Sequence, residues 1–242
     1  MQVSRGPSNN WQQRLSSLGS HSRNLLALVA GFCDTATFIH MGGVFSAHVT
    51  GNFVLFAAAL AKGIQGDDFL KIVTFPVFIL GVALAMLVAG RHARPHRKVV
   101  RILLMITLLL VASALLALIG GYQKPDIRLG NIDVLITLLL VTAMAMQNSI
   151  HRFITGPMTT VMTGTVMNMT ASLVNRYILR IDAESQKAAA TGASPMMMIA
   201  AFALGCVIAG FLTVKIGLAS IGVPAGLLGL VLVMELRKPE PS

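Results

Sequence analysis

The sequence of 242 residues is poor in charge, in acids above all, and in cysteine. Charged residues make up 12% of the chain, whereas an average soluble domain contains about 25%. The two cysteines, Cys33 and Cys206, both lie in apolar segments, which indicates packing roles and argues against a disulfide framework. Hydrophobic residues account for 55% of the chain, and its mean hydropathy is +0.76. This balance excludes an ordinary soluble domain.

Long apolar runs account for the low content of charged residues. Runs such as 71–90 and 99–120 are long enough to cross a bilayer as helices. We therefore predict an all-α polytopic membrane protein whose immediate partner is the lipid bilayer. The apolar runs lie at roughly 25–40, 46–62, 71–90, 99–120, 132–150, 159–175, 196–214 and 216–235.

The net charge of +10 comes from basic residues that lie between the apolar runs. This distribution is typical of topology signals, and no nucleic-acid-binding motif accompanies it, so we predict no nucleic-acid partner. If the runs 46–62 and 159–175 do not cross the membrane but each return to the side from which they entered, the basic loop 91–101 and both termini lie in the cytoplasm. We therefore predict six transmembrane helices and two re-entrant or broken helical segments.

Two polar, glycine-interrupted segments in the two halves align with each other without gaps. They are DTATFIHMGGVFSAHVTGN, which starts at Asp34, and QNSIHRFITGPMTTVMTGT, which starts at Gln147. With three crossings in each half, the second repeat is inverted relative to the first, an architecture common among secondary transporters. We expect a cytoplasmic tail at 1–23, repeats at 24–121 and 122–236, and a second cytoplasmic tail at 237–242.

Each segment contains a pair of residues that suits a sharp chain reversal. Gly42-Gly43 and Gly156-Pro157 are the predicted hinges, because glycine accepts unusual backbone angles and proline interrupts helices. Ser46 and Thr159 follow at once, and we expect them to cap the return helices. Two opposed helix N-termini near the middle of the membrane would form a polar, mildly electropositive pocket.

The same segments resemble the YoaK family of bacterial inner-membrane proteins. The resemblance covers nearly the whole chain after residue 23, although Gly156-Pro157 departs from the turn residues of many relatives. It implies an inner-membrane location and a repeat architecture, without an activity, a substrate or a catalytic residue. The matching positions are Gly31, Asp34, Phe38, Gly42, Gly43, Val44, Phe45, His48, Thr50, Gly51 and Asn52, then Gln147, Asn148, Thr159, Thr160, Val161, Thr163, Gly164 and Thr165.

Asp34 is the only acid expected inside a spanning segment. Because an unpaired buried carboxylate is costly, we expect it to be protonated or to have a partner. A proton- or cation-responsive group in a solute pathway and a carboxyl that only holds the hairpin shape both fit this position. The other pathway candidates are polar or small residues of the two segments: His48, Thr50, Gly51, Asn52, Gln147, Asn148, Thr163, Gly164 and Thr165.

We predict no cofactor and no metal site. A triad of His40, His48 and Asp34 is disfavoured, because His40 and Asp34 lie six residues apart and face nearly opposite sides of one helix. The methionines around 196–198 lack partner cysteines or histidines and suit packing. His48 itself fits either a structural hydrogen bond or a proton relay.

The sequence favours a secondary transporter or channel-like permease for a small polar solute or anion, with its site at the interface of the repeats. One alternative is a membrane-embedded enzyme that uses Asp34 and His48 as acid and base, although no catalytic motif accompanies them. Another is a non-catalytic membrane scaffold or sensor. A homo-oligomer is compatible with each of these hypotheses.

Overall fold

A computed structural model describes residues 18–64, 66–91, 94–120, 130–154, 162–178 and 195–238. The regular structure of these residues is entirely helical, so the predicted all-α class is confirmed. The α-helices are α2 (Ser20–His40), α3 (Val49–Lys62), α4 (Phe69–Ala89), α5 (Pro95–Gly120), α6 (Asn131–Ser149), α7 (Met162–Tyr177), α8 (Pro195–Ile216) and α9 (Gly222–Leu236). Short 3-10 helices adjoin them: η1 (Gly66–Asp68), η2 (Ile150–Arg152) and η3 (Gly217–Ile221).

Several helices have the length and hydropathy of membrane crossings. Four stretches of the described residues meet both conditions, and the last of them contains both α8 and α9. With 21 residues α2 is also long enough, but polar side chains such as Arg23 and Asp34 lower its hydropathy. The number of six crossings therefore stays a prediction. The four stretches are Gly66–Ala89, Pro95–Gly120, Asn131–Arg152 and Pro195–Leu236.

α2 is buried along much of its length and packs most extensively against α8. Gly31 of α2 and Gly205 of α8 bring the two backbones into direct contact. A Cβ atom added to Gly31 would lie 2.2 Å from the carbonyl oxygen of Phe202, and one added to Gly205 would lie 2.1 Å from that of Leu28. Small residues at a helix crossing permit this approach in membranes. A helix of the first half is thereby fixed to a helix of the second half.

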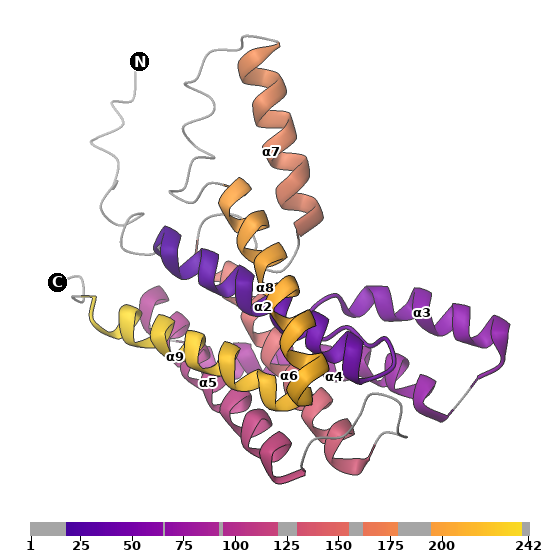
Figure 1. Ribbon diagram of the computed structural model, residues 1–242. Coiled ribbons are helices and arrows are strands. Elements are labelled where there is room, and N and C mark those ends of the chain that lie inside the picture. The colour runs from indigo at the N-terminus through magenta and orange to yellow at the C-terminus, as the bar shows by residue number, and fades with distance from the viewer. Residues whose placement is uncertain are drawn as a thin grey trace, which may run out of the picture.

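A second close pair, α4 and α6, also joins the two halves. A Cβ atom added to Gly81 of α4 would lie 2.7 Å from the Cβ atom of Ala145 on α6. In contrast, α3 and α7 project from the helical body in different directions, and they pack against α4 and α8, respectively (Figure 1). In α3 only Val49 and Asn52 are buried. The two helices expected to turn back into the protein thus leave much of their surface outside the bundle.

A loop interrupts the helical structure between α2 and α3. Gly42 and Gly43 have φ angles of 60° and 84°, which glycine adopts without the steric cost that other residues meet. His48 occupies the N-cap position of α3, and no side chain caps this helix. The expectation that Ser46 is the cap was wrong, because its hydroxyl donates to a carboxylate of α2 instead. Gly156, Pro157 and Thr159, the corresponding residues of the second half, lie outside the described residues.

Candidate functional site

Asp34 holds the loop that follows α2 through three contacts. Its Oδ1 atom accepts hydrogen bonds from the hydroxyl of Ser46 at 3.2 Å and from the backbone N–H of Ala47 at 2.5 Å. Its Oδ2 atom contacts Nδ1 of His48. The residue is only 3% exposed. The expected partner of the buried carboxylate is therefore a run of three consecutive loop residues.

His48 connects this buried carboxylate with the surface of the protein. Its side chain is 39% exposed, whereas that of Asp34 is 5% exposed. The imidazole packs edge-on against the rings of Phe45 and Phe202, at centroid distances of 6.3 and 5.7 Å. Because Nδ1 faces the carboxylate, Nε2 on the other side of the ring is directed away from it. An imidazole oriented in this way is suited to accept or donate a proton.

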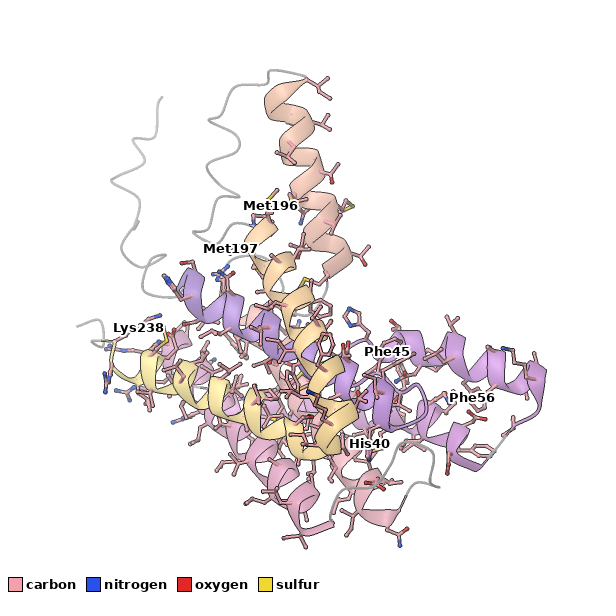
Figure 2. The ribbon with its side chains drawn as sticks, viewed as in Figure 1. His40, Phe45, Phe56, Met196, Met197 and Lys238 are labelled. Carbon is pink, nitrogen blue, oxygen red and sulfur yellow. The ribbon has the colours of Figure 1, made fainter. Side chains whose placement is uncertain are left out.

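Asn52 holds the loop residue directly before these three. Its side-chain amide pairs with both backbone groups of Phe45: Oδ1 accepts from N–H at 2.8 Å, and Nδ2 donates to C=O at 2.9 Å. Nδ2 also donates to the hydroxyl of Thr74 on α4, at 2.9 Å. Gly51 leaves room for the ring of Phe45, which lies at the junction of α2 and α3 (Figure 2). Asn52 is thus part of the structure of the loop, with its polar groups used internally.

Gln147 and Asn148 lie on α6, away from this loop. Nε2 of Gln147 donates to the backbone carbonyl of Leu26 at 2.9 Å, about two helical turns before Asp34 on α2. The Oε1 atom of Gln147 is buried without a hydrogen-bond partner. The backbone carbonyl of Asn148 contacts Nδ1 of His151. The structure therefore separates this amide pair from Asp34, although the two positions align in the sequence.

The remaining candidates do not gather around Asp34. Thr50 is exposed at the start of α3. In the first turn of α7, Thr163 is exposed, Gly164 is half-buried and Thr165 is buried. Among the described residues α3 packs against α4 and α7 against α8, and the expected pocket between two opposed helix N-termini stays a prediction. The compact part of the predicted site is the loop of the first half.

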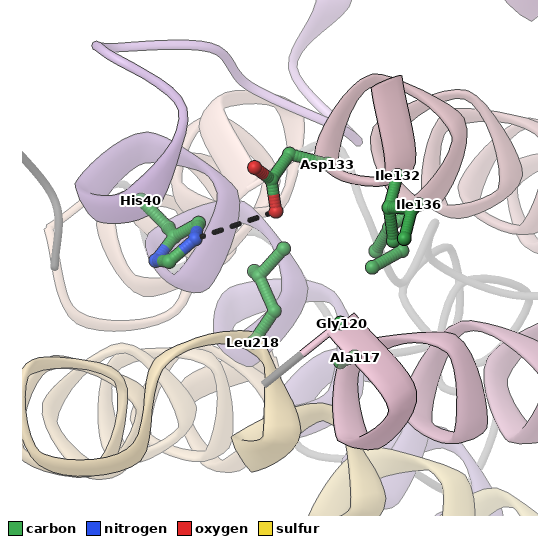
Figure 3. Close-up of a pocket in the computed structure, with 7 residues that line it drawn as sticks. All are labelled: His40, Ala117, Gly120, Ile132, Asp133, Ile136 and Leu218. Carbon is green, nitrogen blue, oxygen red and sulfur yellow. Dashed lines mark ion pairs between the residues drawn. The ribbon is translucent and has the colours of Figure 1, made fainter. Parts of the chain in front are cut away.

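A second histidine–carboxylate pair was not anticipated from the sequence. His40 at the end of α2 faces Asp133 in the first turn of α6, with 3.7 Å between Nε2 and Oδ1 (Figure 3). The Oδ2 atom of Asp133 accepts the backbone N–H of Gly130 at 3.0 Å, the bond of an N-terminal helix cap. The sequence does contain a signal for it, because Asp133 lies just inside the apolar run 132–150.

The sequence suggested that Asp34 is the only acid inside the spanning segments. The structure buries two further acids in the long helices. Asp133 is 8% exposed, and Glu235 of α9 is 1% exposed. The carboxylate of Glu235 accepts the hydroxyl of Ser22 at 2.7 Å and the ammonium of Lys238 at 2.6 Å. Asp133 and Glu235 each lie within two residues of a helix end, where the chain next to that end supplies a donor: Gly130 for Asp133 and Lys238 for Glu235.

The described residues contain no group of three or more His, Cys, Asp or Glu side chains that could hold a metal ion. His40 and His48 face different carboxylates, so the imagined triad with Asp34 is not assembled. Met196 and Met197, in the first turn of α8, are each 59% exposed (Figure 2). Exposed side chains of this kind are compatible with contact to lipid.

Comparison with known proteins supports the assignment made from the paired segments. The UPF0700 transmembrane protein YoaK of Bacillus subtilis (strain 168) is 40% identical over 68 residues, which cover 28% of this chain and 30% of the length of that relative. No solved structure matches the chain. The family described as "Protein of unknown function (DUF1275)" matches residues 24–234. The chain therefore belongs to the DUF1275 family.

Proposed function

We propose that the protein is a secondary transporter or channel-like permease for a small polar solute or anion, and that Asp34 and His48 form its proton-responsive element. The observation that carries this proposal is a buried carboxylate joined to a half-exposed imidazole at a break between two helices. Ionisable residues inside membrane segments are rare, and they commonly mark ion pathways or proton relays.

The contacts of Asp34 suggest how a proton would act. Ser46, Ala47 and His48 all contact the same carboxylate. Hydrogen bonds to a charged acceptor are stronger than those to a neutral one, so protonation of Asp34 weakens all three at once. The loop between α2 and α3 is then held mainly through Asn52 and Phe45. A proton that reaches Asp34 through His48 would thus loosen the three loop residues next to α3 and leave Phe45 held by Asn52.

The relative direction of α2 and α6 supports an inverted repeat. These helices correspond in the alignment of the two segments. His40 at the end of α2 pairs with Asp133 at the start of α6, whereas Gln147 near the end of α6 bonds to Leu26 in the first part of α2. The two helices are therefore antiparallel, which is the relation that inversion in the membrane requires.

The packing between the halves has the same reciprocal pattern. α2, the first helix of one half, packs against α8, and α6, the first helix of the other half, packs against α4. Each of these contacts is made at glycine: Gly31 and Gly205 in one pair, Gly81 in the other. This exchange supports a site between two related halves, the usual place for a solute in such transporters.

The basic segment 91–101 supports an inner-membrane orientation with both termini in the cytoplasm. It contains Arg91, Arg94, Arg97, Lys98 and Arg101 and no acid. Its described arginines are exposed, and the segment runs from the end of α4 into the first two turns of α5. Since Lys and Arg are retained on the cytoplasmic side of inner-membrane proteins, this orientation is the one we propose.

Flux measurements in proteoliposomes test the transport proposal. We expect a panel of small neutral and anionic solutes to include one whose uptake depends on a proton gradient. Asp34→Asn should reduce that uptake by about tenfold or more, because the change removes charge-assisted contacts worth about 1.5–3 kcal/mol each. Asp67→Asn, the same chemical change at an exposed position of η1, is the matched control and should retain uptake.

Two results would contradict the proposal. One is uptake and pH dependence in Asp34→Asn equal to those of the Asp67→Asn control, which would remove the Asp34 carboxylate from the mechanism. The other is chemical conversion of a solute by the protein in detergent, without a gradient, which would indicate a membrane-embedded enzyme. In that case the oriented imidazole of His48 would be the candidate base.

A further inference from the structure

A small pocket lies where the ends of four helical elements meet. The C-terminal ends of α2 and α5, the N-terminal end of α6, and η3 all contribute to it (Figure 3). Its lining is apolar except for His40 and Asp133, which face each other across it. The pocket is therefore separate from the loop held by Asp34. Its lining residues are His40, Ala117, Gly120, Ile132, Asp133, Ile136 and Leu218.

The two polar residues of the pocket are incompletely satisfied by direct contacts. His40 is 5% exposed, and its Nδ1 atom has no hydrogen-bond partner. The distance of 3.7 Å between Nε2 of His40 and Oδ1 of Asp133 is too long for a direct hydrogen bond. Buried polar atoms rarely remain unpaired, and ordered water commonly fills such places. The pocket thus has the chemistry to hold a proton together with water.

We propose that His40 and Asp133 form a second proton-binding site, in which one proton shared by the pair fastens α2 to α6. The relevant ligand is the proton itself, with water as the bridge across the 3.7 Å gap. This site is additional to the Asp34–His48 element and does not depend on transport. It joins the first half of the chain to the second, whereas Asp34 acts within the first half.

The number of protons on the pair determines the strength of this connection. With one proton, an imidazolium faces a carboxylate, and the two attract each other in a poorly solvated pocket. A second proton neutralises Asp133 and leaves a buried imidazolium alone. Without a proton, His40 is neutral, and Asp133 is held mainly by the N–H of Gly130. The connection is therefore strongest in an intermediate pH range and weaker on both sides of it.

Few other titratable groups reach His40 in the described part of the chain. The pocket residues contributed by α5, η3 and the rest of α6 are Ala117, Gly120, Leu218, Ile132 and Ile136, none of which titrates. On α2 itself, Asp34 contacts the loop residues Ser46, Ala47 and His48. Asp133 is consequently the partner to which the titration of His40 responds.

Nitrogen NMR of the intact protein, labelled with 15N at histidine and reconstituted in detergent micelles, tests this site. The chain contains six histidines, and loss of one signal set in His40→Gln assigns His40. We expect His40 to change protonation once within the titrated range, about pH 4 to 9. Asp133→Asn should shift the midpoint of that titration by about one pH unit or more, because an opposite charge within about 4–6 Å is removed.

The controls separate a proton site from a merely structural contact. Asp34→Asn removes the other paired carboxylate and should shift the His40 midpoint by much less than Asp133→Asn does. Asp133→Ser is a second neutral replacement, with a shorter side chain at the third position of α6. The proposal is overturned if His40 keeps one protonation state from pH 4 to 9, or if neither replacement of Asp133 moves its titration.

Discussion

The close crossing of α2 and α8 predicts that a single added methyl group lowers the stability of the protein. Gly205 faces the backbone of α2 so closely that an added Cβ atom would lie 2.1 Å from the carbonyl oxygen of Leu28 and 3.1 Å from the backbone nitrogen of Phe32. Gly210, on the same helix, has nothing within 4 Å of the equivalent added atom. The variants Gly205→Ala and Gly210→Ala therefore make the same chemical change in opposite environments.

The expected difference follows from these distances. Real Cβ atoms do not approach backbone atoms more closely than about 3 Å, so Gly205→Ala requires the two helices to separate by about 1 Å. Overpacking of this kind typically costs about 1–3 kcal/mol. Gly210→Ala meets no such obstacle and gains up to about 1 kcal/mol from the higher helix propensity of alanine. We expect the two variants to fall on opposite sides of the wild type.

Thermal unfolding of purified protein in one detergent measures this difference. For a chain of this size, 1 kcal/mol corresponds to about 2–4 °C in Tm. Gly205→Ala should thus unfold at least about 2 °C below Gly210→Ala. Gly31→Ala, which meets the carbonyl of Phe202 at 2.2 Å, should behave like Gly205→Ala. Equal Tm values for Gly205→Ala and Gly210→Ala would refute the close crossing and, with it, the assigned contact between the halves.

Two further predictions concern the loop between α2 and α3. Asn52→Ala should lower the free energy of unfolding by about 2–4 kcal/mol, because both backbone groups of Phe45 and the hydroxyl of Thr74 lose their partner. Thr50→Ala, at an exposed position, is the control and should change the free energy of unfolding by less than about 0.5 kcal/mol. Urea or thermal titration of the pair checks this, and equal stabilities would contradict it. Gly43→Ala should lower the free energy of unfolding by about 1–2 kcal/mol in the same assay, because the φ angle of Gly43 is 84°. A steric clash does not contribute, since an added Cβ atom would meet Phe38 at the ordinary contact distance of 3.7 Å. An unchanged Tm would contradict the positive φ angle.

Local sequence patterns were sufficient to place the helices. Most described residues of the apolar runs lie in helices, because hydropathy and length act within one segment. The interruption of the chain at Gly42-Gly43 is likewise a local property of glycine. Membership in the DUF1275 family also follows from local motifs, since the paired segments lie within the matched residues 24–234.

Partners across the bundle could not be predicted, because they depend on how helices pack. Ser46 has the residue type of a helix cap, yet the nearby carboxylate of Asp34 takes its hydroxyl. The role of Asp133 shows only in its contact with His40 on another helix, which no local pattern indicates. Gly205 lies against α2, and one sequence could not identify Gly31 and α2 as the opposite surface.

The two histidine–carboxylate pairs connect the end of α2 to two different parts of the protein. Asp34 contacts a loop 12 to 14 residues further along the chain, whereas His40 faces a helix of the other half. Their positions, six residues apart, place them on different sides of α2, so each pair can respond to protons without a shared side chain. On the proposals made above, a proton at Asp34 loosens the loop, and a change at His40 weakens the contact between halves. A variant at one pair should therefore leave the proton response of the other intact, and a loss of both responses in Asp34→Asn would show that α2 transmits strain between them.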